Sequence, residues 1–207
     1  MSETDAKAHL HRYLQSGRDA LLWKLDGLSE YDARRPLVPT GTNLLGLVKH
    51  VAGTEAGYLG DVFGRPFPET LPWMSDDAEP NSDMWATVDE SRDDIVGLYR
   101  RVWEHSDATI EALSLDATGT VPWWRPETRG VTLQQIILHM IAETHRHAGQ
   151  ADIVRELIDG AAGLQLGNDN LPDGDRAWWA AHRGRIEAAA LVAENSASSA
   201  ASAESRA

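Results

Sequence analysis

Residues 138–150 read LHMIAETHRHAGQ, and this short segment carries the strongest structural signal in the chain. Successive side chains of an α-helix are rotated by about 100°, so Glu143 and His147 lie on one face, one turn apart. The same face carries Ile136, Met140, Ala151, Val154 and Ile158. We therefore predict a helix whose core-facing side holds a carboxylate and an imidazole.

A carboxylate on an apolar helix face needs a partner, because burying it alone costs several kcal/mol. A salt bridge or a capping hydrogen bond would satisfy a lone buried Glu. A Glu followed by a His at i+4 favours a metal ion instead, since both side chains can converge on one ion. We expect Glu143 and His147 to be metal ligands.

His50 is the candidate for a third ligand. The segment around it is apolar almost all round, which predicts a buried helix, and His50 and Lys49 are the only long polar side chains in its first half. His50, Glu143 and His147 would leave coordination positions open, as in catalytic metal sites. The chain has no Cys, so the ligands must be nitrogen and oxygen atoms. We expect a divalent ion, zinc first, with nickel or iron as alternatives.

Other residues near these ligands allow two interpretations. Gly46, Gly53 and Gly57 share the His50 face, where they either permit close helix packing or leave a hollow. His105 and His139 are candidate catalytic residues that could move protons, although a hydrogen-bonded core histidine is the more common explanation for His139. His145 should project to the solvent side of its helix.

Apolar spacing predicts an all-α fold with four long helices, which is typical of a four-helix bundle. No segment shows convincing strand alternation. We expect the helical domain to span residues 1–193 and a Ser/Ala-rich tail, residues 194–207, to be disordered. The link over residues 64–85 is long enough to cross the bundle between the second and third helices. The long helices are expected at residues 5–28, 42–62, 88–113 and 132–159, followed by a short helix at 176–192. Thr42 is the expected N-cap of the second helix. The fourth should begin with a capping box at Thr132 and Gln135 and end at Gly160.

Composition excludes several classes of protein. The formal net charge of −13 over 207 residues argues against nucleic-acid binding, because a duplex-binding surface must neutralise phosphates. No apolar run is long enough to span a membrane, and the acidic N-terminus is unlike a signal peptide. We therefore expect a cytoplasmic protein that does not bind membranes and could form a homodimer.

The segments LVKHVA around His50 and ETHRHAGQADI from Glu143 resemble the DinB/YfiT-like family of metal-binding four-helix bundles. The flanks Trp123-Trp124 and Trp178-Trp179 resemble an actinobacterial subfamily of that superfamily, and Glu143 resembles the branch with mycothiol-dependent maleylpyruvate isomerase. The resemblance implies a transferase or isomerase that uses a low-molecular-weight thiol such as mycothiol, together with an electrophile. A bound metal would activate the thiolate, and the thiol must come from the cosubstrate because the chain has no Cys. Two alternatives stay open: a hydrolase with metal-bound water as nucleophile, and a non-catalytic stress protein that binds metal or small molecules.

Overall fold

The computed structural model describes the backbone of residues 2–204, which divides after Asp169 into two units. The described chain is predominantly helical, as expected. Unit 1 (residues 1–169) contains four long helices. They are α1 (Glu3–Trp23), α3 (Leu44–Leu59), α4 (Arg92–Ala112) and α5 (Leu133–Asp159). None of the described helices is both long and apolar enough to cross a bilayer.

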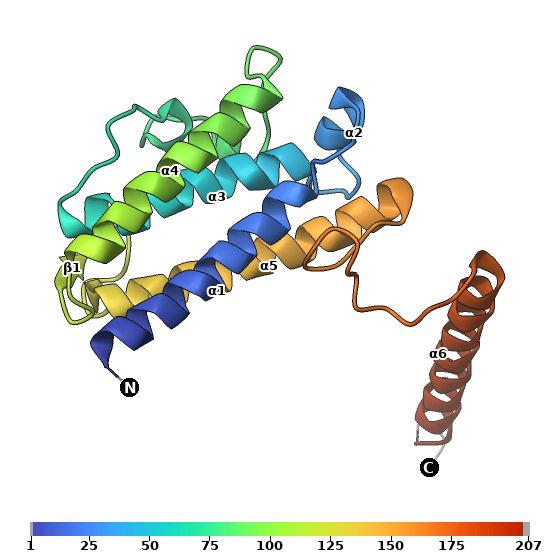
Figure 1. Cartoon of the computed structure of the whole chain (residues 1–207). Helices are drawn as coiled ribbons and strands as arrows, with labels where there is room; N and C mark the ends of the chain where they lie inside the picture. The colour runs from blue at the N-terminus through green and yellow to red at the C-terminus, as the bar shows by residue number, and fades with distance from the viewer. Residues whose placement is uncertain (1, 205–207) are drawn as a thin grey trace. The chain divides into compact units, whose positions relative to one another are not determined.

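The four long helices pack against one another through three main seams. Helix α1 lies along α5, and α3 lies against both α4 and α5 (Figure 1). Figure 1 also shows α3 and α4 running in the same direction, opposite to α1 and α5. The link between α3 and α4 therefore returns along the length of α3, and it brings its own residues over that helix.

Short elements complete unit 1. They are α2 (Glu30–Arg34), the 3₁₀ turns η1 (Asp61–Phe63), η2 (Pro72–Met74) and η3 (Ser82–Met84), and the strands β1 (Thr118–Thr120) and β2 (Gly130–Thr132). The two strands pair antiparallel, with Gly119 opposite Val131. We expected no strands. Three residues are too few to produce a readable alternation, so the sequence pattern could not reveal them.

The ends of α5 follow the local sequence. Thr132 Oγ1 accepts a hydrogen bond from the Gln135 backbone N–H at 3.3 Å, and Gly160 closes the helix with φ of 83°. For α3 the predicted N-cap, Thr42, was wrong. Asn43 takes that place, because its Oδ1 accepts from Gly46 N at 2.8 Å while its amide donates to Met84 O at 3.1 Å.

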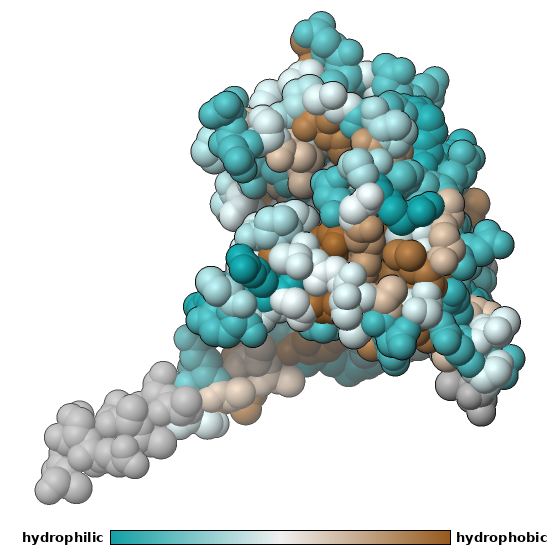
Figure 2. All heavy atoms as spheres, turned by 90° about the vertical axis from the view of Figure 1, so that its left-hand side faces the viewer, coloured by the Kyte–Doolittle hydropathy of each residue, from teal (hydrophilic) through white to brown (hydrophobic). Residues whose placement is uncertain are grey.

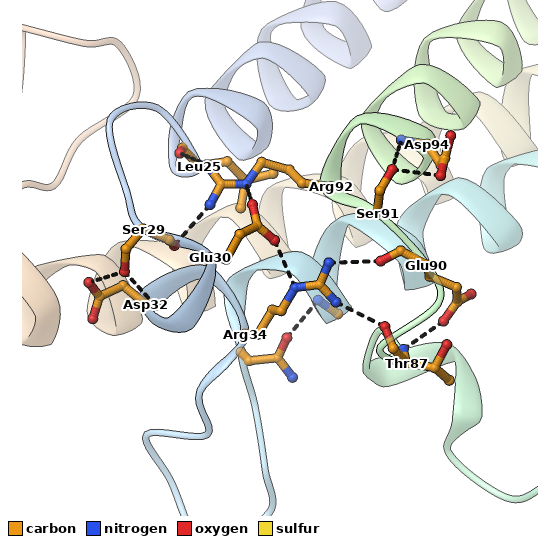
Figure 3. Close-up of polar contacts among 12 residues, drawn as sticks. Leu25, Ser29, Glu30, Asp32, Arg34, Thr87, Glu90, Ser91, Arg92 and Asp94 are labelled. Atoms are coloured by element: carbon orange, nitrogen blue, oxygen red, sulfur yellow. Dashed lines mark hydrogen bonds and ion pairs between the residues drawn. The ribbon is translucent and has the colours of Figure 1, made fainter.

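The end of the link is fastened to the corner between α1 and α2. Arg34 donates to the carbonyls of Thr87 and Glu90, at 3.0 and 2.7 Å, and Arg92 donates to Ser29 O at 2.8 Å (Figure 3). Glu30 pairs with both arginines. These bonds fix where α4 begins.

The middle of the link is fastened to α3 by a buried lysine. Lys49 is 2% exposed, and its Nζ donates to the carbonyls of Ser82 and Trp85 and pairs with Glu90. Satisfying a buried ammonium with several acceptors avoids the cost of an unpaired charge. The turn η3, with Asp83 at its centre, is thereby held over the face of α3 that carries His50.

The core of unit 1 contains a charged pair that the sequence analysis did not anticipate. Arg18 of α1 and Glu55 of α3 are both fully buried, and Arg18 Nη2 lies 2.5 Å from Glu55 Oε1. Arg18 Nη1 also donates to Asp107 of α4 at 2.8 Å. Burial alone would lower the pKa of Arg18, but the Glu55 carboxylate outweighs it and raises that pKa. This network joins three of the four long helices.

Unit 2 (residues 170–207) contains α6 (Arg176–Glu204). The rings of Trp178 and His182 stack at 5.2 Å between centroids. We expected the helical domain to run to residue 193 and the tail from 194 to be disordered, whereas the described helix continues to Glu204. Alanine is the strongest helix former, so an Ala-rich tail is compatible with helix. The last three residues, 205–207, lie outside the described part of the chain.

Candidate functional site

His50 and His147 meet at the seam between α3 and α5. Their ring centroids lie 4.7 Å apart, with an interplanar angle of 71°. Glu143 is one turn earlier on α5, and its Oε2 lies 3.4 Å from His147 Nε2. The three side chains that we predicted as metal ligands therefore gather in one place.

Hydrogen bonds at Nδ1 determine which ring nitrogen of each histidine carries the proton. His50 Nδ1 lies 2.5 Å from Asp83 Oδ2, and His147 Nδ1 lies 2.8 Å from Gln150 Oε1. Both partners are acceptors, so each Nδ1 carries the proton and donates it. In the neutral form of each ring, Nε2 then carries the lone pair, which is the arrangement of histidines that bind metals.

The electrostatics around His147 favour the neutral ring. Burial lowers the pKa of His147, and the neighbouring His50 lowers it further. The Glu143 carboxylate acts in the opposite direction and raises the pKa of His147, and its Oε2 lies 3.4 Å from Nε2, where a proton or a metal cation can lie between the two atoms. This donor set, with imidazole nitrogens and one carboxylate, fits a divalent metal ion.

The geometry is not closed around an ion. In the part of the chain that the structure describes, no group of three or more His, Asp or Glu side chains is placed to hold a metal as it stands. We expected Glu143 on the core face, whereas its side chain is 32% exposed.

A pocket of about 550 Å³ lies along the C-terminal half of α3, and its described lining includes none of His50, Glu143 and His147. Gly53 and Gly57 form part of its wall, although a Cβ on Gly53 would lie 2.6 Å from Met74 Sδ, so Gly53 also serves close packing. A Cβ on Gly46 would lie 1.8 Å from Met84 O, so this glycine serves close packing against the link. Figure 2 shows the side of the molecule that lies on the left of Figure 1, toward which the C-terminal end of α3 points, and apolar residues reach the surface there among hydrophilic ones.

His139 and His105 occupy different surroundings. The His139 ring lies 4.6 Å from that of Tyr58, which lines the pocket. His105 Nε2 lies 2.6 Å from the Arg65 carbonyl, to which it donates, and its ring packs against Phe67 of the pocket wall. Both candidate proton carriers thus contact a pocket residue through their rings, and His105 is in addition hydrogen-bonded to the backbone at Arg65.

One expectation about α5 was wrong. We expected His145 to project to solvent, but it is half-buried against α1, with its Nε2 3.1 Å from the Tyr13 carbonyl. Gly17 of α1 allows this approach, because a Cβ there would lie 3.1 Å from the His145 ring. Helix α5 is covered by helices on two sides, so its polar face is not wholly exposed.

Sequence reasoning missed two residues of the site. Asp83 lies in an irregular link, where no periodicity indicates the direction of a side chain. Tyr58 could have been found, because it follows His50 by about two helical turns on the same apolar helix.

Comparison with known families adds an independent observation. The family model described as Mycothiol-S-transferase matches residues 9–160. The chain belongs to the mycothiol S-transferase family. This confirms the resemblance to the DinB-like superfamily, and it indicates a small-molecule thiol as a partner of the family. The match spans α1 to α5, with His50, Glu143 and His147 inside it, and ends before unit 2. No curated protein matches the chain.

Proposed function

We propose that this member of the mycothiol S-transferase family is a metal-dependent enzyme that joins a low-molecular-weight thiol to an electrophile. His50, Glu143 and His147 would bind one divalent ion, with zinc as the first choice. The observation that carries the proposal is the close pair of His50 and His147 rings at the α3–α5 seam, with Asp83 and Gln150 on their Nδ1 atoms, so that both Nε2 atoms remain for a metal ion. In this proposal the long helices form a bundle of DinB/YfiT type, with the link crossing between α3 and α4.

Each surrounding residue has a part in this chemistry. A bound divalent ion would lower the pKa of a coordinated thiol, so that the reactive thiolate is present at neutral pH. Asp83 and Gln150 hold the two imidazoles in orientation, and Glu143 supplies negative charge. The pocket, whose lining on α3 begins at Gly53, about one helical turn after His50, would hold the second substrate.

The proposal is tested by asking whether turnover of an electrophile requires both a thiol and a metal ion. Purified protein is mixed with mycothiol and 1-chloro-2,4-dinitrobenzene, and the conjugate is followed by absorbance, with and without a chelator. We expect product only when thiol is present, loss of turnover after chelation, and recovery on adding Zn²⁺. Loss of an ester substrate without thiol would point to a hydrolase instead. Metal binding without turnover across a panel of thiols and electrophiles would support a non-catalytic binding protein.

A further inference from the structure

Tyr58 is a wall residue of the pocket with an unusual hydrogen-bond pattern. It is 8% exposed, and its hydroxyl oxygen accepts hydrogen bonds from Trp123 Nε1 at 3.1 Å and from Trp124 Nε1 at 2.8 Å. A phenol oxygen has two lone pairs and one hydrogen. Both described hydrogen bonds use lone pairs, so the hydroxyl hydrogen remains for a further acceptor.

Two indole donors fix the orientation of that hydrogen. An indole N–H can only donate, so Trp123 and Trp124 direct the O–H bond of Tyr58 away from themselves and toward a further acceptor. General acid catalysis needs an O–H group that is positioned in this way.

The position of Tyr58 relates it to the candidate metal ligands. Helices α3 and α5 run in opposite directions, so the ring pair Tyr58–His139 and the ring pair His50–His147 lie on the same seam. Eight residues of α-helix span about 12 Å, which separates the two pairs along α3. Thr54 and Gly57 lie between them on α3, and both line the pocket. In the proposed reaction, a small organic substrate in the pocket would extend from Tyr58 toward the His50–His147 pair.

The lining of the pocket limits the charge of that substrate. The described lining residues include Asp61, Glu69 and Asp76 but no Lys or Arg. Arg101 neutralises Glu69 through two hydrogen bonds, at 2.6 and 2.8 Å, which leaves the other two carboxylates. Tyr58, Phe67 and Trp123 add aromatic surface. An anionic electrophile would be repelled, whereas an uncharged, largely apolar one would be accepted.

We propose that Tyr58 is the proton donor for an uncharged conjugated carbonyl, an enone or a quinone, bound in this pocket. The inference rests on the proposed thiol transfer. The thiolate sulfur bonds to the β-carbon, the double-bond electron pair shifts toward the carbonyl, and the carbonyl oxygen takes the Tyr58 proton to give the enol. Solvent then returns one proton to Tyr58, which balances the proton that the thiol released when it formed the thiolate.

The experiment compares two electrophiles in Tyr58→Phe. Addition to 4-phenyl-3-buten-2-one needs a proton at oxygen, whereas 1-chloro-2,4-dinitrobenzene loses chloride and needs none. We expect kcat for the enone to fall about 100-fold or more, which is the usual scale of general acid catalysis. The kcat for 1-chloro-2,4-dinitrobenzene should change less than about threefold. Tyr13→Phe, at an exposed tyrosine, should change neither. Trp124→Phe keeps the hydroxyl but removes one donor, so it should slow the enone reaction alone, by a smaller factor.

A binding measurement separates this inference from the transfer reaction. Quenching of tryptophan fluorescence reports binding of the enone without any turnover. Loss of one hydrogen bond should weaken binding to Tyr58→Phe about 3- to 10-fold. Equal affinities, or equal losses of kcat with both electrophiles, would overturn the role of Tyr58. Wild-type protein that binds the enone through Tyr58 yet conjugates neither electrophile would contradict the proposed function alone.

Discussion

Asp83 Oδ2 lies 2.5 Å from His50 Nδ1, although 33 positions separate the two residues in the sequence. A carboxylate on the far nitrogen of a ligand histidine fixes the ring and raises its basicity, and its loss typically costs 10- to 100-fold in metal affinity. We therefore expect Asp83→Ala to weaken zinc binding by about that factor, with Asp83→Asn in between. Competition with a chromophoric chelator measures it. Asp77→Asn, on the same link, is the control, and an equal loss there would contradict the role of Asp83.

The glycines of the pocket should separate ligand access from metal binding. A Cβ on Gly57 would lie 3.3 Å from Trp123, so Gly57→Leu should fill the space over Tyr58. We expect the KM for the electrophile to rise at least about tenfold while the metal content stays unchanged. Overpacking costs about 1–3 kcal/mol, so denaturant unfolding is measured in parallel.

Gly184→Leu, where a Cβ meets nothing within 4 Å, is the control for this pocket variant. A folded Gly57→Leu protein that keeps its metal and an unchanged KM would show that substrate does not enter over this glycine.

The buried Arg18–Glu55 pair should be a large determinant of stability. Removing one partner of a buried ion pair leaves the other charge uncompensated, at a cost of about 3–5 kcal/mol. Glu55→Ala is expected to lower the free energy of unfolding by about that amount. Glu30→Ala, at a mostly exposed pair, should cost no more than about 1 kcal/mol. Similar losses in the two variants, measured by urea unfolding, would mean that the buried arginine finds another partner.

Much of this architecture could be predicted because the periodicity of apolar residues and the capping residues indicate where helices begin and end. The run of residues through Glu143 and His147 had an apolar stripe, a cap at Thr132 and a stop at Gly160, and α5 follows all three. The approach of His50 to His147 could also be expected, since a helix that is apolar all round must have neighbours on most sides.

The remainder depends on tertiary contacts that local patterns do not encode. Asp83 reaches His50 because Lys49 holds the carbonyls of Ser82 and Trp85, and none of these bonds follows from a repeat in the sequence. The partner of the buried Glu55 lies 37 residues away, on α1. The helical spacing places Tyr58 on the same helix as His50, but its two indole donors, Trp123 and Trp124, lie more than 60 positions away in the sequence.

The most direct test of the central claim is the zinc content of purified protein, measured by elemental analysis in wild type and four alanine variants. We expect about one ion per chain in wild type and loss of most of it in His50→Ala, Glu143→Ala and His147→Ala. His145→Ala should retain the metal, because the His145 Nε2 is bonded to the Tyr13 carbonyl and lies on the α1 side of α5. Metal content that is the same in all four variants, whether kept or lost, would contradict the assignment of His50, Glu143 and His147 as the ligands.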